Sequence, residues 1–299
     1  MIFGPEEWYN STNRKEVPSV AVIISSDSAC DLFPDLYRER GIEIVPLYIT
    51  IRGESRRDMF EITPDELFGD YQATQILPKT SAPPPADFSE LFRRLTQNGD
   101  SVVHLSMNSK MSASYQNACI AAGEFKNVCV VDTRTLSSAQ GLLALRAADL
   151  RDEGKSAQEI YERIEKAKKK IRTYVLLDTL VYAYRGGRAT LLQAFGANLL
   201  KLRPCLLLNT AGDLSVCKKF RGNFAQVCRE YTRFVLSLPN PDEGRAAVTT
   251  TGMDPALFEE VAGMVRGSGL FREVITSRAG CTMTTHTGPN TLVIFYFEK

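Results

Sequence analysis

The chain has 299 residues, about twice the common length of a single domain, so its length favours two hydrophobic cores. Lys and Arg total 36 against 35 Asp and Glu, and a net charge of +1 argues against broad, charge-driven binding to nucleic acid. With 44% hydrophobic and 24% charged residues, the composition is typical of a folded, soluble protein and excludes a mainly disordered chain.

Several further classes of protein are disfavoured by the pattern of residues. The longest apolar runs, such as 292–297, are far shorter than the roughly 20 residues that cross a bilayer, so we expect no stable membrane insertion. Residues 1–18 form a polar arm without the features of a secretory signal, which predicts a cytoplasmic protein. The seven cysteines are scattered and never form a CxxC pair, so we expect reduced thiols and no metal site.

The first half of the chain reads as repeated strand, loop and helix. Residues 19–26 predict a strand, 31–40 a helix and 42–51 a second strand. Thr63 followed by Pro64 predicts a helix start, and apolar residues at 88, 91, 92 and 95 predict the buried stripe of another helix. Residues 101–106 and 128–131 predict two more strands, each followed by a helix, which indicates a parallel sheet. Residues 151–172 predict a charged surface helix near a domain junction.

The second half of the chain has a different pattern. Residues 174–177 predict a strand, and 205–219 predict two strands joined by a turn at Ala211-Gly212-Asp213. An amphipathic helix over 224–238 follows, and then strand, helix, strand and strand over 246–250, 255–266, 274–277 and 292–297. We therefore predict an α/β protein of two domains: a three-layer α/β/α domain with a mainly parallel sheet over 19–170, and an α+β domain with a mainly antiparallel sheet over 171–299.

Polar clusters lie next to the ends of the predicted strands, where ligand sites collect in α/β folds. They are Asp27-Ser28, Thr80-Ser81-Ala82-Pro83, Ser109 to Tyr115, Arg185-Gly-Gly-Arg188 and His286-Thr-Gly-Pro289. Hydroxyls at a helix start, with free backbone N–H groups behind them, form a neutral cradle for an anionic head group. The same hydroxyls serve equally well as ordinary helix caps, and the Arg-Gly-Gly-Arg motif as a helix C-cap with two surface arginines. Spacing alone therefore leaves both interpretations open.

The common catalytic and nucleotide motifs are missing from the sequence. No G-x-S-x-G elbow surrounds Ser112, no phosphate-binding G-x-x-x-x-G-K-[ST] occurs, and no G-x-G-x-x-G follows the first predicted strand. Cofactor enzymes of these common classes are therefore disfavoured.

Taken in order from about Ser19 to the C-terminus, the motifs resemble those of the DegV family. This family consists of fatty-acid-binding proteins that act as lipid-presenting subunits of bacterial fatty acid kinase in phospholipid metabolism. The motifs that carry the resemblance are Ser26-Asp27-Ser28 with Asp31-Leu32, Thr80-Ser81-x-Pro83, the serine-rich run ending at Tyr115, Val131-Asp132-Thr133, Arg185-Gly-Gly-Arg188, Leu202-Arg-Pro204 and His286-Thr-Gly288.

The resemblance implies a carrier that catalyses nothing by itself and uses no cofactor. It also implies a bound long-chain fatty acid and a set of residues around its carboxylate. A threonine and a serine hold the carboxylate in the family, and they match Thr80 and Ser112. The surrounding polar residues match Ser81, Ser114, Arg188, His286 and Thr287. Arg221, after the hairpin, matches the residue that meets the separate fatty acid kinase catalytic subunit.

Two departures and one rival hypothesis accompany this resemblance. The family's Ser-Gly-Thr reads Ser112-Ala113-Ser114 here, and its Thr-Asp-Ser reads Ser26-Asp27-Ser28, so the head-group geometry and the lipid preference can differ.

The rival hypothesis is an acyl hydrolase or acyltransferase that uses Ser112 and His286, and a third reading is an interaction protein that senses lipid. For the lipid tail, the sequence offers only candidates that serve equally well as core: Phe224, Phe234, Phe258, Met264 and Leu199-Leu200.

Overall fold

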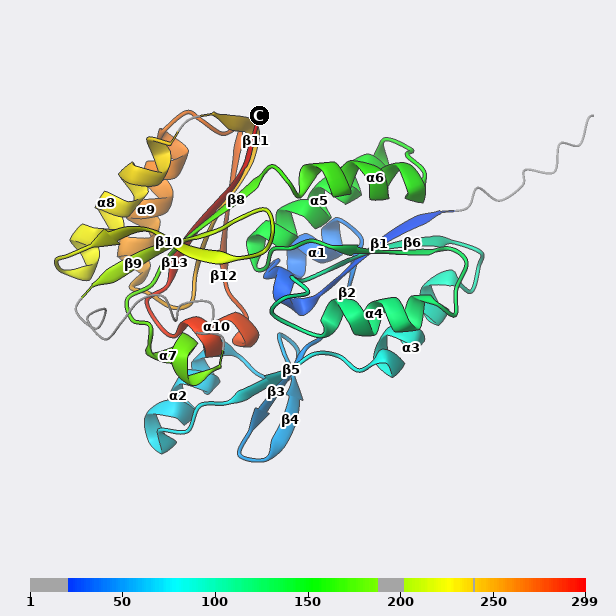
Figure 1. Cartoon of the computed structure of the whole chain (residues 1–299), viewed down its shortest axis with the longest axis horizontal. Coiled ribbons are helices and arrows are strands. Elements are labelled where there is room, and N and C mark those ends of the chain that lie inside the picture. The colour runs from blue at the N-terminus through cyan, green and yellow to red at the C-terminus, as the bar shows by residue number, and fades with distance from the viewer. Residues whose placement is uncertain (1–20, 188–201, 239) are drawn as a thin grey trace, which may run out of the picture.

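The computed structural model describes residues 21–187, 202–238 and 240–299 and contains two main β-sheets side by side, with a smaller sheet below them (Figure 1). The strands are β1 (Val22–Asp27), β2 (Ile42–Val45), β3 (Tyr48–Ile51), β4 (Glu54–Arg57), β5 (Lys79–Ser81), β6 (Ser101–Ser106), β7 (Val128–Asp132), β8 (Ile171–Leu176), β9 (Arg203–Leu208), β10 (Leu214–Phe220), β11 (Pro241–Thr250), β12 (Glu273–Arg278) and β13 (Leu292–Glu298). The helices are the 3₁₀ turn η1 (Ser28–Cys30), α1 (Pro34–Glu39), α2 (Pro64–Thr74), α3 (Pro85–Thr96), α4 (Ser114–Ala122), α5 (Ser138–Asp152), α6 (Ala157–Ala167), α7 (Val181–Arg185), α8 (Phe224–Leu236), α9 (Pro255–Gly267) and α10 (Cys281–Thr287).

The first sheet is fully parallel, in the order β2-β1-β6-β7, and it is covered on both faces. Helices α3 and α4 pack on one face, while α1, α5 and α6 pack on the other (Figure 1). The apolar stripe predicted for α3 is confirmed, because Phe88, Leu91, Phe92 and Leu95 are all buried. This is the predicted three-layer α/β/α arrangement.

The prediction of one strand over residues 42–51 is wrong. The segment forms β2 in the parallel sheet and β3 in a separate three-stranded antiparallel sheet of order β4-β3-β5. Pro46 lies between the two strands, and a proline has no N–H to donate to a sheet ladder. The chain therefore changes sheets at this residue, and the second sheet positions β5.

The charged region over 151–172 also differs from its prediction. Helix α6 occupies only Ala157–Ala167, and it buries Ile160 and Ile164 in the main core. The strand β8 begins at Ile171, inside the range predicted as helix. Two isoleucines at i and i+4 are sufficient to bury one face of a short helix whose other faces are charged.

The second sheet has six strands in the order β10-β9-β8-β13-β11-β12, and every pair is antiparallel except β11 and β12. The turn predicted at residues 211–213 joins β9 to β10, as expected. Helices α8 and α9 cover one face of this sheet (Figure 1). The predicted fold class is thereby confirmed, whereas the division into residues 1–18, 19–170 and 171–299 stays a prediction, and residues 1–18 lie outside the described part of the chain.

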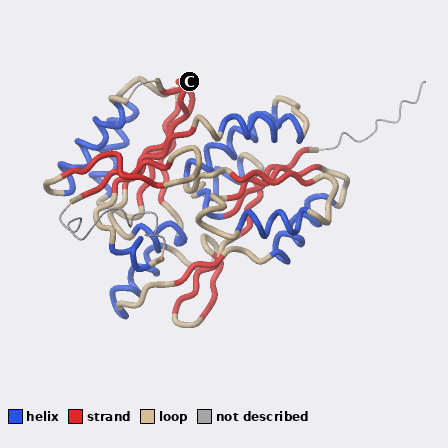
Figure 2. Tube along the Cα trace, in the orientation of Figure 1, coloured by secondary structure: helices blue, strands red, loops and turns tan. Residues whose placement is uncertain are grey.

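Helix α5 lies between the two main sheets, as the tube in Figure 2 makes visible. Its leucines and alanines belong to one continuous core that also contains Ile24 of β1, Val103 of β6 and Phe295 of β13. Most of its residues are buried, and its charged side chains lie in its second half, from Arg146 onward. Burial on several sides is typical of a central helix with partners around it.

Candidate functional site

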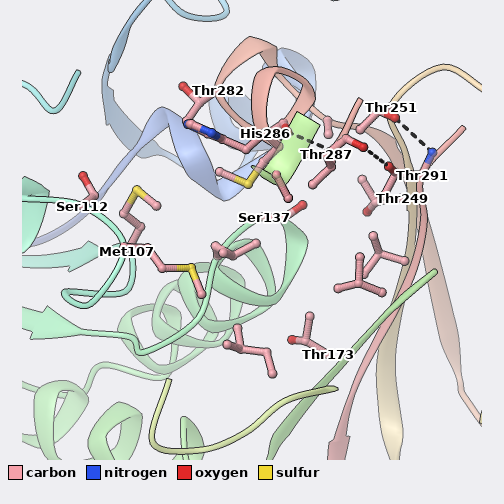
Figure 3. Close-up of a pocket in the computed structure, with 18 of the residues that line it drawn as sticks. Met107, Ser112, Ser137, Thr173, Thr249, Thr251, Thr282, His286, Thr287 and Thr291 are labelled. Carbon is pink, nitrogen blue, oxygen red and sulfur yellow. Dashed lines mark hydrogen bonds between the residues drawn. The ribbon is translucent and has the colours of Figure 1, made fainter. Parts of the chain in front are cut away.

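A cavity of about 270 Å³ lies between the six-stranded sheet, the start of α5, helix α10 and the segment that follows β6 (Figure 3). Its apolar lining includes Leu47, Met107, Met111, Leu136, Val175, Leu177, Leu206, Leu208, Val293 and Phe295. Thr80, Ser81, Ser112, His286 and Thr287 line the same cavity. The site thus combines a mostly apolar wall with a small group of polar side chains.

The apolar wall follows from the two-residue period of the strands. On β8, Thr173 and Val175 line the cavity, while Tyr174 and Leu176 belong to the core beneath α8 and α9. The same alternation places Leu206 and Leu208 of β9, and Val293 and Phe295 of β13, on the cavity side. Successive side chains of a strand point to opposite faces, so one face of the sheet forms a core and the other forms the wall.

Threonines make up much of the remaining wall, and the hydroxyls of Thr249, Thr251 and Thr173 bond to other parts of the protein. The hydroxyls of Thr249, Ser138 and Ser277 lie within 2.7–2.8 Å of one another. The Thr251 hydroxyl donates to the Gly288 carbonyl at 2.5 Å. The Thr173 hydroxyl lies 3.4 Å from that of Thr135. Because these oxygens are already paired, they add little polarity to the cavity.

Three polar side chains meet the cavity from three different elements. Thr80 is held on β5, where it pairs with Ile49 of β3, and its Oγ1 lies 2.8 Å from Nε2 of His286 on α10. The Ser112 Oγ, just before α4, accepts a hydrogen bond from the Ser114 backbone N–H at 3.1 Å. A hydroxyl that accepts through a lone pair keeps its own proton for donation. Thr80, Ser112 and His286 are each partly exposed, so a ligand can reach them.

His286 lies in the short helix α10. Two buried carboxylates from distant segments hold the first turn of this helix. Asp58 accepts hydrogen bonds from the backbone N–H groups of Cys281 and Thr282 at 2.8 and 3.0 Å, and Asp31 accepts one from Gly280 at 2.8 Å. Negative groups at a helix N-terminus satisfy its free donors and its dipole.

Burial perturbs both of these carboxyl groups. It raises the pKa of Asp31 to about 7, against hydrogen bonds from Ser137 and Gly280 that lower it, and the nearby Asp58 raises it further. Burial likewise raises the pKa of Asp58, although its hydrogen bonds with Thr282 and Cys281 oppose the shift. The two carboxyls therefore favour their protonated forms more than exposed carboxyls do.

Two glycines allow the Arg-Gly-Gly-Arg and His-Thr-Gly motifs to pack together. A Cβ on Gly186 would lie 2.6 Å from the His286 Nδ1, and one on Gly288 would lie 2.1 Å from the Tyr182 ring. Gly288 also has a φ of +74°, which favours glycine. These close contacts place α7 against α10 and fix the position of the His286 ring.

The remaining predicted site residues have different surroundings. Ser114 is fully buried and does not line the cavity; its hydroxyl donates to Asp27 at 2.8 Å. The Thr287 hydroxyl donates to the Met283 carbonyl at 2.9 Å within α10. Ser81 lines the cavity and is exposed. Arg188 lies outside the described residues.

Asp27, at the end of β1, is the centre of a buried polar network. It accepts hydrogen bonds from the Met107 N–H at 2.9 Å and from the Gln140 side chain at 2.8 Å, in addition to the Ser114 hydroxyl. Burial raises its pKa, and these hydrogen bonds oppose the shift. The network joins β1, β6, α4 and α5 where the connection after β1 leads to β2 at one edge of the sheet and the connection after β6 leads to β7 at the other edge. Ligand sites of α/β folds lie at such a point.

None of the described candidates for tail contacts lines the cavity. Phe224, Phe234 and Phe258 pack against the core under α8 and α9, on the opposite face of the sheet. Met264 of α9 is not among the residues lining the described cavity, and Leu199-Leu200 lies outside the described residues. The true lining comes from alternate residues of β8, β9 and β13, which read as ordinary buried strands.

The residues that position α10 and line the cavity wall carry little signal in the sequence. Asp58 has no distinguishing sequence context, and Tyr182 reads as one more helical aromatic. Among these residues, only the threonines at 249–251 carry a signal in the sequence. Hydroxyls at the end of a buried strand need hydrogen-bond partners, which indicates a polar site at that strand end.

Arg221 lies in a separate and more open groove at the far edge of the six-stranded sheet. This basic groove is lined by Leu202, Lys218, Lys219, Phe220, Arg221, Glu230, Arg233, Phe234 and Ser237. Lys218 Nζ lies 4.2 Å from the centre of the Phe234 ring, a cation–π contact. Among the described residues, no cluster of three or more His, Cys, Asp or Glu side chains suits a metal ion, and no helix is long and apolar enough to cross a bilayer.

The fold and cavity define a class of two-sheet α/β proteins with an internal, mostly apolar site. A family model described as "Uncharacterised protein, DegV family" matches residues 19–299, and the chain therefore belongs to the DegV family. A DegV domain-containing protein of Caldanaerobacter subterraneus subsp. tengcongensis is 31% identical over 284 residues, which cover 93% of this chain and 99% of that one.

Solved structures of relatives agree with this assignment. A DegV family protein from Thermus thermophilus, described for its fatty acid binding, has a TM-score of 0.85 and 31% identity, with 94% of this chain and 100% of that chain covered. DegV of Bacillus subtilis, described as a fatty acid binding protein, has a TM-score of 0.82 and 26% identity over 94% of this chain and 100% of that one.

Proposed function

We propose that this protein binds a long-chain fatty acid in the cavity and presents its carboxylate to a separate fatty acid kinase. The observation that carries the proposal is a cavity with an apolar wall that is also lined by Ser112 and by the hydrogen-bonded pair of Thr80 and His286. Fatty acid binding by relatives of the same fold supports it.

The affinity comes mainly from the tail. At about 0.8 kcal/mol per buried methylene, a tail of roughly 15 methylenes gains about 12 kcal/mol gross on leaving water. Hydrogen bonds to a charged head group contribute about 1.5–3 kcal/mol each. The apolar wall therefore supplies most of the binding free energy, and the hydroxyls set the position of the carboxylate.

The head group needs donors, because an ionised carboxylate only accepts hydrogen bonds. Ser112 has a hydroxyl proton to give while its oxygen caps the Ser114 N–H. Thr80 has one as well when Nε2 of His286 carries the ring proton and donates to the Thr80 oxygen. His286 thus acts by orienting Thr80. The geometry assigns the Ser114 and Thr287 hydroxyls to Asp27 and to the α10 backbone.

A cradle of neutral hydroxyls suits both a carboxylate and its acyl phosphate, since no Lys or Arg among the described residues lines the cavity and would retain the more highly charged product. The phosphorylating group comes from the kinase catalytic subunit, and this chain uses no cofactor of its own. Arg221 in the basic groove is exposed and supplies the contact with that subunit.

The alternative, an acyl hydrolase or acyltransferase, requires Ser112 and His286 to act as nucleophile and base. A nucleophile and its base normally lie within hydrogen-bond reach of each other. Here the Nε2 of His286 bonds with Thr80, and the Ser112 oxygen is bonded to the Ser114 N–H. This arrangement favours binding over hydrolysis.

The decisive experiment is mass spectrometry of the lipid released by denaturing protein purified from a bacterial host. We expect a saturated or unsaturated acid of about 14 to 18 carbons, a range that the resemblance to the DegV family implies and that agrees with the tail length considered above. Protein that is empty and also fails to take up added palmitate or oleate would contradict the proposal. In the same preparation, turnover of a p-nitrophenyl ester that disappears in Ser112→Ala would instead support the hydrolase.

A further inference from the structure

The β9–β10 hairpin brings two cysteines into contact. The Sγ atoms of Cys205 and Cys217 lie 3.3 Å apart. Val216 pairs with Leu206 and Lys218 pairs with Cys205, so Cys217 is the extra residue of a β-bulge. The bulge is what places the Cys217 side chain beside Cys205, because a regular ladder would give Cys205 one opposing residue only.

The two thiols differ sharply in their access to solvent. Cys205 is fully buried in the core beneath α8, whereas Cys217 is exposed. Among the described strands, β10 is the edge of the six-stranded sheet and is bonded only to β9. A small oxidant can therefore reach Cys217 first, and the edge strand has room to adjust.

We propose that Cys205 and Cys217 form a reversible disulfide when the protein meets a peroxide. The Cys217 thiolate attacks one oxygen of hydrogen peroxide, the O–O bond breaks, and a sulfenic acid and one water form once the departing hydroxide takes up a proton. The Cys205 sulfur then attacks the sulfenic sulfur, the S–O bond breaks, and a second water leaves with the Cys205 proton. Two thiols are oxidised as one peroxide is reduced, and a dithiol reductant reverses the step by exchange.

The geometry favours this step over other fates of the two thiols. A disulfide needs a sulfur separation of about 2.05 Å, so the pair must close by about 1.2 Å. The hydrogen bond with Cys205 lowers the pKa of Cys217, and the neighbouring Lys218 charge lowers it further. The same hydrogen bond and burial raise the pKa of Cys205. The exposed thiol is thus the one that reaches the reactive thiolate form.

The test uses the full chain treated with hydrogen peroxide, then denatured, alkylated and analysed by mass spectrometry. We expect two fewer alkylated cysteines than the seven of the untreated protein, and a peptide in which residues 205 and 217 are cross-linked. Dithiothreitol should restore all seven alkylation sites.

Two variants serve as matched controls. Cys217→Ser, at an exposed site, should keep every remaining thiol through the same treatment. Cys119 is also exposed, but its side-chain partner is Tyr115, so Cys119→Ser should still lose two thiols. Oxidation of Cys217 to a sulfinic acid with Cys205 still alkylated, or a dimer linked through Cys217, would overturn the proposal.

Discussion

Thr80→Val is the sharpest probe of the head-group site. Valine keeps the shape of threonine and removes the hydroxyl that lies 2.8 Å from the Nε2 of His286. If this hydroxyl donates to the ligand carboxylate, its loss removes one hydrogen bond to a charged group, worth about 1.5–3 kcal/mol. We therefore expect the Kd for palmitate to rise roughly 10- to 150-fold, with binding retained through the tail.

The assay is calorimetric or fluorescence titration with palmitate and, in parallel, with its methyl ester. The ester carries no charge, so the variant should lose less than about tenfold in affinity for it. Ser55→Ala, on the exposed strand β4, is a control that removes a hydroxyl outside the cavity lining and should bind both ligands like the unaltered protein. Equal affinity of Thr80→Val and the unaltered protein for palmitate would refute the role given to Thr80.

Four further predictions follow from the geometry. Val175→Phe narrows the cavity, so binding of stearate should weaken more than binding of myristate, by roughly fourfold for each methylene expelled, in the same titration. Gly288→Ala places a Cβ against the Tyr182 ring at a positive φ, so the free energy of unfolding measured in urea should fall by about 2–4 kcal/mol. Because the pKa of Asp31 rises from 3.8 to about 7 on folding, its contribution to stability is complete below about pH 4 and falls as the pH rises to about 7. In this pH window, Asp31→Asn should reduce the slope of the unfolding free energy against pH by up to about 1.4 kcal/mol per pH unit, as measured in unfolding curves. Arg221→Glu should abolish kinase-dependent phosphorylation of the bound acid while the co-purified lipid remains; loss of the lipid as well would show that the residue has another role.

The elements that could be predicted from the sequence are those with a strong local signal. The α3 stripe repeats with the helical period, and the turn at Gly212 separates two β-rich runs. The break at Pro46 carried a signal too, but the apolar residues on both sides suggested one continuous strand. Local pattern thus identifies an element more securely than it identifies the sheet to which the element belongs.

Helix α10 could not be predicted, because its sequence opposes its structure. The segment is rich in threonine, which is β-branched and has a low helix propensity. Asp31 and Asp58 stabilise it from positions more than two hundred residues earlier in the chain. The residues proposed for the carboxylate site come from motif resemblance, whereas the cavity wall depends on which face of the sheet meets α5, and that is a property of the assembled fold.

The central position of α5 has a mechanical consequence. Because its buried side chains are covered on one side by the parallel sheet and on the other by the six-stranded sheet, separating the two halves would expose the leucines and alanines of this helix to water. Neither half can unfold while the other keeps its native surroundings, so the protein should unfold as one cooperative unit. The cavity walls therefore stay aligned for as long as α5 remains buried between the two sheets.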